Sequence, residues 1–201
     1  MTEPSRLAGA AAAGVAAFFL VALAVQFLRP DLDWYTTPLS FYLFGPYGPL
    51  LQAAYVALAL GTLALGLGWY RALSPAATSF APTLLFIVAA VGIVVTALAR
   101  TDTWAGPPTL EGFVHGNAAR TAFLAITTAM LLQSWRLRHD LNWRRYFSPA
   151  FALAAICFVA LWVHTLWRGS PRGLGQKLVI VLIVAWLALA ALWLKRSRRG
   201  P

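Results

Sequence analysis

Long uncharged apolar runs limit what this chain can fold into. Four runs contain no Asp, Glu, Lys or Arg, at residues 7–28, 34–70, 72–99 and 146–167. Each is long enough for a helix that crosses the hydrocarbon core of a bilayer, which takes about 20 residues. The chain is 60% hydrophobic and 11% charged, whereas soluble domains average roughly 45–50% apolar and 25% charged residues. The sequence therefore predicts an integral membrane protein.

The whole chain contains about six expected membrane-spanning helices, which form an all-α polytopic bundle in a single domain over residues 1–201. The fourth span is the least apolar because it includes Arg120, although a span tolerates one basic residue that snorkels or pairs. Connections are short, so consecutive helices should be antiparallel neighbours. Ala57, Gly61, Ala64 and Gly68 recur at helical spacing and favour close helix contact. The expected spans are residues 7–28, 46–69, 81–99, 113–135, 148–167 and 175–194.

Basic residues predict the orientation of the bundle. Of the 16 Lys and Arg residues, ten fall on the N-terminal side of the expected membrane, including four within residues 136–145 and four within residues 195–199. Cytoplasmic loops carry an excess of Lys and Arg, so both termini are expected in the cytoplasm. The basic residues lie between apolar spans and not along one helical face, which favours contact with anionic lipid headgroups over a nucleic-acid partner.

The first apolar run has an alternative interpretation as a cleaved signal peptide. Arg6 precedes it, and residues 22–24 resemble a cleavage site. The run has 22 uncharged residues, longer than the apolar core of about 7–15 residues in signal peptides. A retained helix is therefore the preferred prediction.

Most side chains capable of chemistry lie on the connections expected outside the cell. Residues 100–120 contain Asp102, Glu111, His115 and Arg120. If the fourth helix begins near residue 110, Glu111 and His115 share one face. The Arg120 guanidinium is then expected to pair with the carboxylate of Asp102 or Glu111, or to lie in a water-filled cleft. These residues form either a ligand site or a structural ion pair that closes the loop.

A second histidine, His164, is expected at the outer end of the fifth span, at a depth similar to that of His115. Two histidines together with Asp102 can bind a divalent metal, and two histidines can ligate haem. The alternative is a pair of unrelated interfacial histidines. No motif of a soluble hydrolase, a zinc enzyme or a phosphate-binding loop is present.

Three motifs carry a resemblance to a known family: residues 38–45 (PLSFYLFG), His115-Gly116 after the Asp102 loop, and residues 173–177 (GLGQK). The chain resembles, over nearly its whole length, the DUF998 family of small bacterial and archaeal membrane proteins. The resemblance implies a multi-pass protein of the bacterial or archaeal cytoplasmic membrane. Two positions depart from the family pattern: Phe41 follows Ser40 where the family has an acid, and Ala119 stands where a second histidine is common.

We interpret the chain as a membrane protein with a polar pocket on the outer side, which binds a small polar molecule or a lipid headgroup. Alternatives are a metal-dependent membrane hydrolase or a haem or metal protein, a non-catalytic assembly partner or homo-oligomer, and a transporter. Transport is less favoured because the deep parts of the spans lack ionisable residues. Whether the protein is an enzyme stays open. The candidate pocket residues are Ser40, Asp102, Glu111, His115, Arg120, His164, Gln176 and Lys177.

Overall fold

The computed structural model describes residues 3–103, 106–167 and 169–196, and within them it contains six long α-helices, two short 3-10 helices and no strand. The prediction of an all-α fold is confirmed, and each helix matches an expected span to within four residues at either end. The helices are α1 (Glu3–Leu28), α2 (Gly48–Ala72), α3 (Phe80–Leu98), α4 (Leu110–Leu137), α5 (Phe147–Leu166) and α6 (Arg172–Arg196), with η1 (Leu39–Leu43) and η2 (Arg144–Tyr146) between them.

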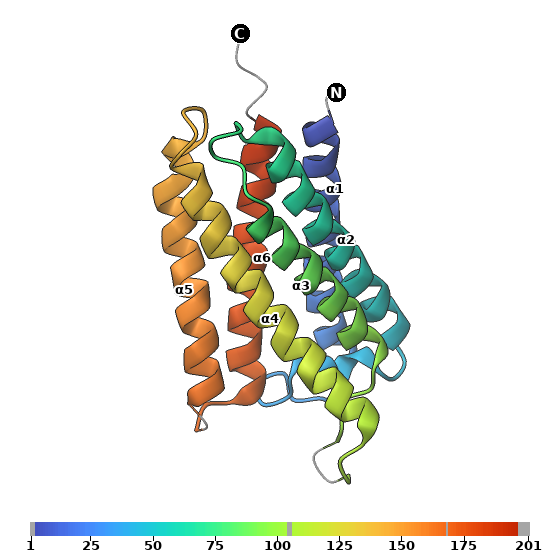
Figure 1. Ribbon diagram of the computed structural model, residues 1–201. Helices are drawn as coiled ribbons and strands as arrows, with labels where there is room; N and C mark the ends of the chain where they lie inside the picture. The colour runs from blue at the N-terminus through green and yellow to red at the C-terminus, as the bar shows by residue number, and fades with distance from the viewer. Residues whose placement is uncertain (1–2, 104–105, 168, 197–201) are drawn as a thin grey trace.

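The helices form an up-and-down bundle in which α1 begins and α6 ends at the same end (Figure 1). We call this the terminal end, and the opposite end, which carries η1, the cap end. Each helix packs against its neighbours in sequence, and α6 also packs against α1, which closes the bundle. Consecutive helices are antiparallel, as the short connections predict.

Five segments are long and apolar enough to cross a membrane: α1, α2, α3, α6 and Arg144–Leu166, which contains α5. The chain is therefore a multi-pass membrane protein. Helix α4 is less apolar, but its 28 residues span about 42 Å at 1.5 Å per residue, and it crosses the bundle beside α3 and α5 (Figure 1). Because α1 begins where α6 ends, α4 supplies the sixth passage between the two ends.

Small residues bring α1 and α2 into direct backbone contact. A Cβ added at Gly14 would lie 2.3 Å from the carbonyl oxygen of Ala57, and one added at Gly61 would lie 3.1 Å from that of Ala11. Such small-residue contacts are typical of membrane helix pairs, where dispersion contacts between backbones replace hydrophobic association. The close approach positions α2, which contributes a polar side chain to the site described below.

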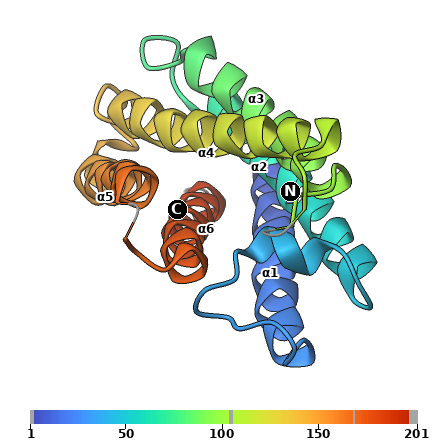
Figure 2. The same cartoon turned by 90° about the horizontal axis from the view of Figure 1, so that it is seen from below.

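Residues 29–47, which we call the cap segment, fold across the cap end between α1 and α2 and reach α6 (Figure 2). Two backbone amides of α6 bind it: Gly173 donates to the carbonyl of Thr36 at 3.0 Å, and Leu174 donates to that of Tyr35 at 2.8 Å. Within the segment, η1 is mostly buried through Leu39, Tyr42 and Leu43. The cap segment is therefore packed into the bundle, and it covers the space described next.

Candidate functional site

A cavity of about 70 Å³ lies beneath the cap segment and is lined by residues of α1, α2, α3, α4, α6 and η1. One water molecule needs about 10–15 Å³ on this measure, so the cavity has room for several waters or a small polar group. Its walls are mainly apolar, with Phe18, Leu58, Ile93, Ala119, Ala122, Phe123, Ile126, Ile180, Ile183 and Val184. Four polar groups on the cavity wall form no hydrogen bond with a described residue: the hydroxyls of Ser40 and Tyr55, Nε2 of His115 and the amide nitrogen of Gln176. A fifth polar side chain, Thr96, donates its hydroxyl to the carbonyl of Gly92.

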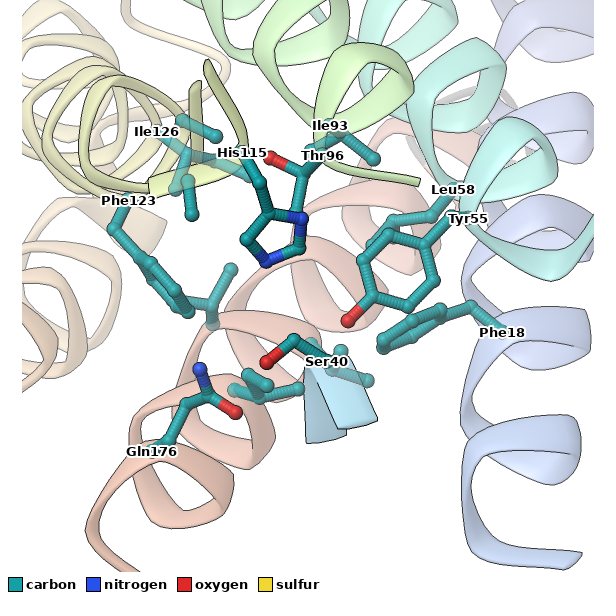
Figure 3. Close-up of a pocket in the computed structure, with 15 residues that line it drawn as sticks. Phe18, Ser40, Tyr55, Leu58, Ile93, Thr96, His115, Phe123, Ile126 and Gln176 are labelled. Carbon is teal, nitrogen blue, oxygen red and sulfur yellow. The ribbon is translucent and has the colours of Figure 1, made fainter. Parts of the chain in front are cut away.

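His115 lies in the second turn of α4, where its side chain is buried. Its Nδ1 is 2.9 Å from the backbone oxygen of Ala99, the residue that ends α3. A carbonyl oxygen only accepts hydrogen bonds, so Nδ1 is the protonated nitrogen and, in the neutral ring, Nε2 carries a lone pair. Figure 3 shows Nε2 pointing into the cavity. His115 therefore presents a hydrogen-bond acceptor to whatever occupies the space.

Two hydroxyl groups face the same space from other elements. Figure 3 shows the phenol oxygen of Tyr55, on α2, and the hydroxyl of Ser40, on η1, directed toward the cavity beneath His115. An edge-to-face contact with Phe18, with ring centroids 5.1 Å apart, orients the Tyr55 ring. No described residue forms a hydrogen bond with either hydroxyl. Neither oxygen is among the fully buried side-chain atoms without a partner, so both hydroxyls reach the cavity space and can bond to water or a ligand there.

Gln176, in the second turn of α6, connects the cavity to its cover. Its Oε1 accepts a hydrogen bond from the backbone amide of Leu39 in η1 at 2.8 Å. Because that partner is a donor, the oxygen of the side-chain amide must face η1 and the NH₂ group must face away from it. In Figure 3 this nitrogen lies on the cavity side. Gln176 therefore holds η1 in place and adds a hydrogen-bond donor to the cavity.

Together these groups offer one acceptor, one amide donor and two hydroxyls that both donate and accept. No charged side chain lines the cavity. The described residues contain no hydrogen bond between Ser40 and His115, the contact by which a histidine activates a serine nucleophile. The arrangement is therefore suited to binding an uncharged polar group.

A wider cleft of about 340 Å³ lies beside the cavity, between α4, α5 and α6. It contains Arg120 and His164, two of the candidate residues, together with Arg172. Arg120 donates to Oδ1 of Asn117 at 3.3 Å, and Nδ1 of His164 is buried without a hydrogen-bond partner among the described residues. The cleft shares the lining residues Ala119, Phe123 and Gln176 with the cavity.

The other three candidate residues, Asp102, Glu111 and Lys177, line neither the cavity nor the cleft. Asp102 accepts hydrogen bonds from the hydroxyl of Thr109 at 2.7 Å and from its backbone amide at 3.2 Å. Thr109 in turn caps α4 by accepting from the amide of Gly112. Lys177 donates to the carbonyls of Trp34 and Thr37 in the cap segment. Glu111 is exposed on the first turn of α4.

The expected metal set of His115, His164 and Asp102 is not brought together. The three side chains lie in the cavity, the cleft and the α4 cap, and the described residues contain no group of three His, Cys, Asp or Glu side chains placed to hold a metal ion. Among the described residues His115, His164 and Asp102 therefore form no three-ligand metal site, and haem ligation by the two histidines stays a prediction. Of the two expected environments for Arg120, the structure shows the cleft. Among the described residues Arg120 forms no ion pair with Asp102 or Glu111, since Asp102 is bonded to Thr109 and Arg120 to Asn117.

Tyr55 is the cavity residue that the sequence argument missed. Tyr55 lies within an expected apolar span, and nothing in the spacing of α2 distinguishes its face from the others. Its phenol, roughly one third of the way along the span, was the available signal, since a hydroxyl at that depth needs a partner.

Comparison with protein-family models matches residues 12–193 to DUF998, described as a protein of unknown function. This match covers most of the chain and includes every residue of the cavity and the cleft. Searches of curated proteins and of solved structures gave no significant match.

Proposed function

The chain belongs to the DUF998 family, and we propose that this multi-pass membrane protein binds a small polar molecule, or the polar headgroup of a lipid, in the cavity beneath the cap segment. The proposal rests on one observation: polar groups of Ser40, Tyr55, His115 and Gln176 converge on an otherwise apolar cavity without bonding to the protein there.

The energetics of buried polar groups support this proposal. A polar group that loses its water without gaining another partner costs roughly 1–3 kcal/mol, so the contents of the cavity are favoured when they form hydrogen bonds with these four groups. Ordered water can do this in the resting protein. A ligand that reproduces those hydrogen bonds and also contacts the apolar walls would displace the water favourably.

The donor set also limits the ligand. No charged side chain lines the cavity, so the part of the ligand that enters should be uncharged, with hydroxyl, amide or carbonyl groups. A single imidazole together with two hydroxyls and an amide is a weak set for a transition metal, which binds several nitrogen or sulfur ligands. With both termini in the cytoplasm, as the basic residues predict, the cavity lies in the outer half of the membrane.

Native mass spectrometry of the protein purified from its own membrane tests the proposal. We expect the wild type to retain a bound small molecule or lipid. Tyr55→Phe and Ser40→Ala should each lower its occupancy, because each removes one hydroxyl with little change in shape. Tyr70→Phe is the matched control: it makes the same change on the same helix, at an exposed side chain outside the cavity.

Equal occupancy in Tyr55→Phe, Ser40→Ala and the wild type would count against the cavity as the binding site. A wild type that retains nothing, and whose thermal unfolding does not respond to extracts of its own membrane, would overturn the proposal altogether. Unfolding temperatures of all variants, measured in the same detergent, show that they are folded.

A further inference from the structure

The cleft between α4, α5 and α6 concentrates positive charge without compensating acids. Arg120 and Arg172 both line it, and neither forms an ion pair with a described carboxylate. The ion pairs found among the described residues are elsewhere, Arg29 with Asp31 and Arg71 with Glu3. Near a membrane, an arginine without a carboxylate partner is usually paired with another anion or exposed to water.

The residues that line the cleft change from basic near the cap end to apolar deeper in the bundle. Arg172 is the first residue of α6, at the cap end. Leu124 lies one turn beyond Arg120 along α4, toward the membrane centre, and Leu161 lies nearly one turn deeper than His164 on α5. Basic groups therefore occupy the part near the cap end, and leucines occupy the deeper part. This order matches a lipid, with its headgroup at the surface and its acyl chains below.

The neighbouring surface is one that lipid covers. Ile156, Val159 and Val163 on α5 are each about half exposed or more, as expected for side chains facing acyl chains. Trp162 lines the cleft and is also partly exposed, and tryptophan is enriched at the level of lipid headgroups. The cleft thus opens next to the lipid-facing surface of α5.

We propose that this cleft binds the phosphate group of an anionic phospholipid, with Arg120 and Arg172 as its ligands and the acyl chains along Leu124 and Leu161. Arginine suits this role because its planar guanidinium forms paired hydrogen bonds with phosphate oxygens. The volume of about 340 Å³ exceeds what a free phosphate needs, and the apolar lower part gives a lipid a contact that a soluble anion lacks. The proposal concerns residues other than the four polar groups of the cavity and does not depend on them.

The test measures lipid retention by native mass spectrometry, with phosphatidylglycerol and phosphatidylcholine added to the detergent-purified protein in equal amounts. The wild type should prefer the anionic lipid. In Arg120→Gln/Arg172→Gln the preference should fall at least about ten-fold, since each basic residue near an anionic lipid contributes about five-fold. The control Arg6→Gln/Arg100→Gln removes the same charge outside the cleft and should change the preference by less than about two-fold.

Equal losses in the two double variants would mean that only net charge matters, and would overturn the proposal. So would displacement of phosphatidylglycerol by inorganic phosphate at matched ionic strength, because the site would then take a soluble anion. If the double variant does not purify as a single species, the single variants decide. Arg120→Gln and Arg172→Gln should each reduce the preference about five-fold, and a preference unchanged in both would refute the assignment. An unchanged cavity ligand in these variants separates this result from the proposed function.

Discussion

Nδ1 of His115 donates to the backbone oxygen of Ala99 at 2.9 Å, a hydrogen bond that joins the start of α4 to the end of α3. The bond fixes both the tautomer and the orientation of the ring, so that Nε2 faces the cavity (Figure 3). One side chain thus closes the α3–α4 connection and supplies the acceptor of the proposed site.

His115→Ala should remove both contributions. We expect the free energy of unfolding to fall by about 1–3 kcal/mol, because the oxygen of Ala99 loses its partner, and the cavity ligand to be lost. Reversible denaturation in mixed detergent micelles measures the first effect and native mass spectrometry the second. His139→Ala, at an exposed position near the terminal end, should change stability by less than about 0.5 kcal/mol. A stable His115→Ala variant that keeps the ligand would contradict the assignment.

Phe123 lines both the cavity and the cleft, so Phe123→Ala should connect the two spaces. We expect diethyl pyrocarbonate, which modifies imidazole nitrogens, to react with His115 faster in this variant than in the wild type. Peptide mass spectrometry gives the rate at each histidine, with exposed His139 as the internal standard. Phe158→Ala, on α5 and outside both spaces, is the control. A His115 rate unchanged relative to His139 would show that Phe123 does not separate cavity from cleft.

Gly14→Ala should destabilise the bundle, because the added methyl group would meet the backbone oxygen of Ala57 at 2.3 Å. Overpacking of this kind typically costs about 1–3 kcal/mol. Gly9→Ala is the matched change on the same helix, where a Cβ meets nothing within 4 Å. There the higher helix propensity of alanine should leave stability unchanged or raise it by up to about 1 kcal/mol. Equal effects of the two changes in the denaturation assay would disprove the close contact.

The cap segment should lose stability in acid through Asp33. The Thr36 hydroxyl and the Tyr35 amide donate hydrogen bonds to its carboxylate, and together with the Lys177 charge they hold the pKa of Asp33 below its ordinary value. A lowered carboxyl pKa stabilises the fold above the unfolded value, and this contribution disappears as the pH falls through the folded value. Asp33→Asn should therefore unfold at a lower temperature than the wild type at neutral pH, with a difference that shrinks in acid. If the difference in unfolding temperature between the wild type and Asp33→Asn grows on acidification, the ionised Asp33 carboxylate does not stabilise the fold and the prediction is wrong.

The predicted orientation is tested by labelling intact cells with a membrane-impermeant maleimide. In a Cys157→Ser background, Leu110→Cys at the cap end should react and Leu141→Cys at the terminal end should not. Both leucines are highly exposed, so the two changes are matched. Labelling of Leu141→Cys alone would invert the bundle, placing the cavity in the inner half of the membrane.

Helices α1, α2, α3 and α5 could be predicted because each corresponds to an uncharged apolar run of the right length. Helices α4 and α6 could be predicted because a span tolerates one basic residue. The sequence also predicts that Ser40, His115 and Gln176 lie at the same end of the bundle, since antiparallel connections bring the starts of α4 and α6 beside the segment before α2. The sequence does not predict how each helix is rotated about its own axis. In α4 and α6 the polar residues are spread around the helix, so no one-sided stripe in the sequence shows that His115 faces the cavity while Arg120 faces the cleft.

The carboxylate of Asp102 illustrates a second limit. Sequence spacing placed it near Arg120, but the backbone and hydroxyl of Thr109, at the start of α4, are closer partners. Loop geometry decides between such partners, and the positions of residues along the chain do not encode it.

The bonds between the cap segment and α6 also set an order of assembly. Leu39 and its partner Gln176 are 137 residues apart, and Lys177 is 143 residues from Trp34. A chain that enters the membrane from its N-terminus contains the cap segment long before the helix that anchors it exists. The cavity can therefore be completed only after α6 has been synthesised and inserted, because until then it lacks both the anchor of its cover and the wall that α6 supplies.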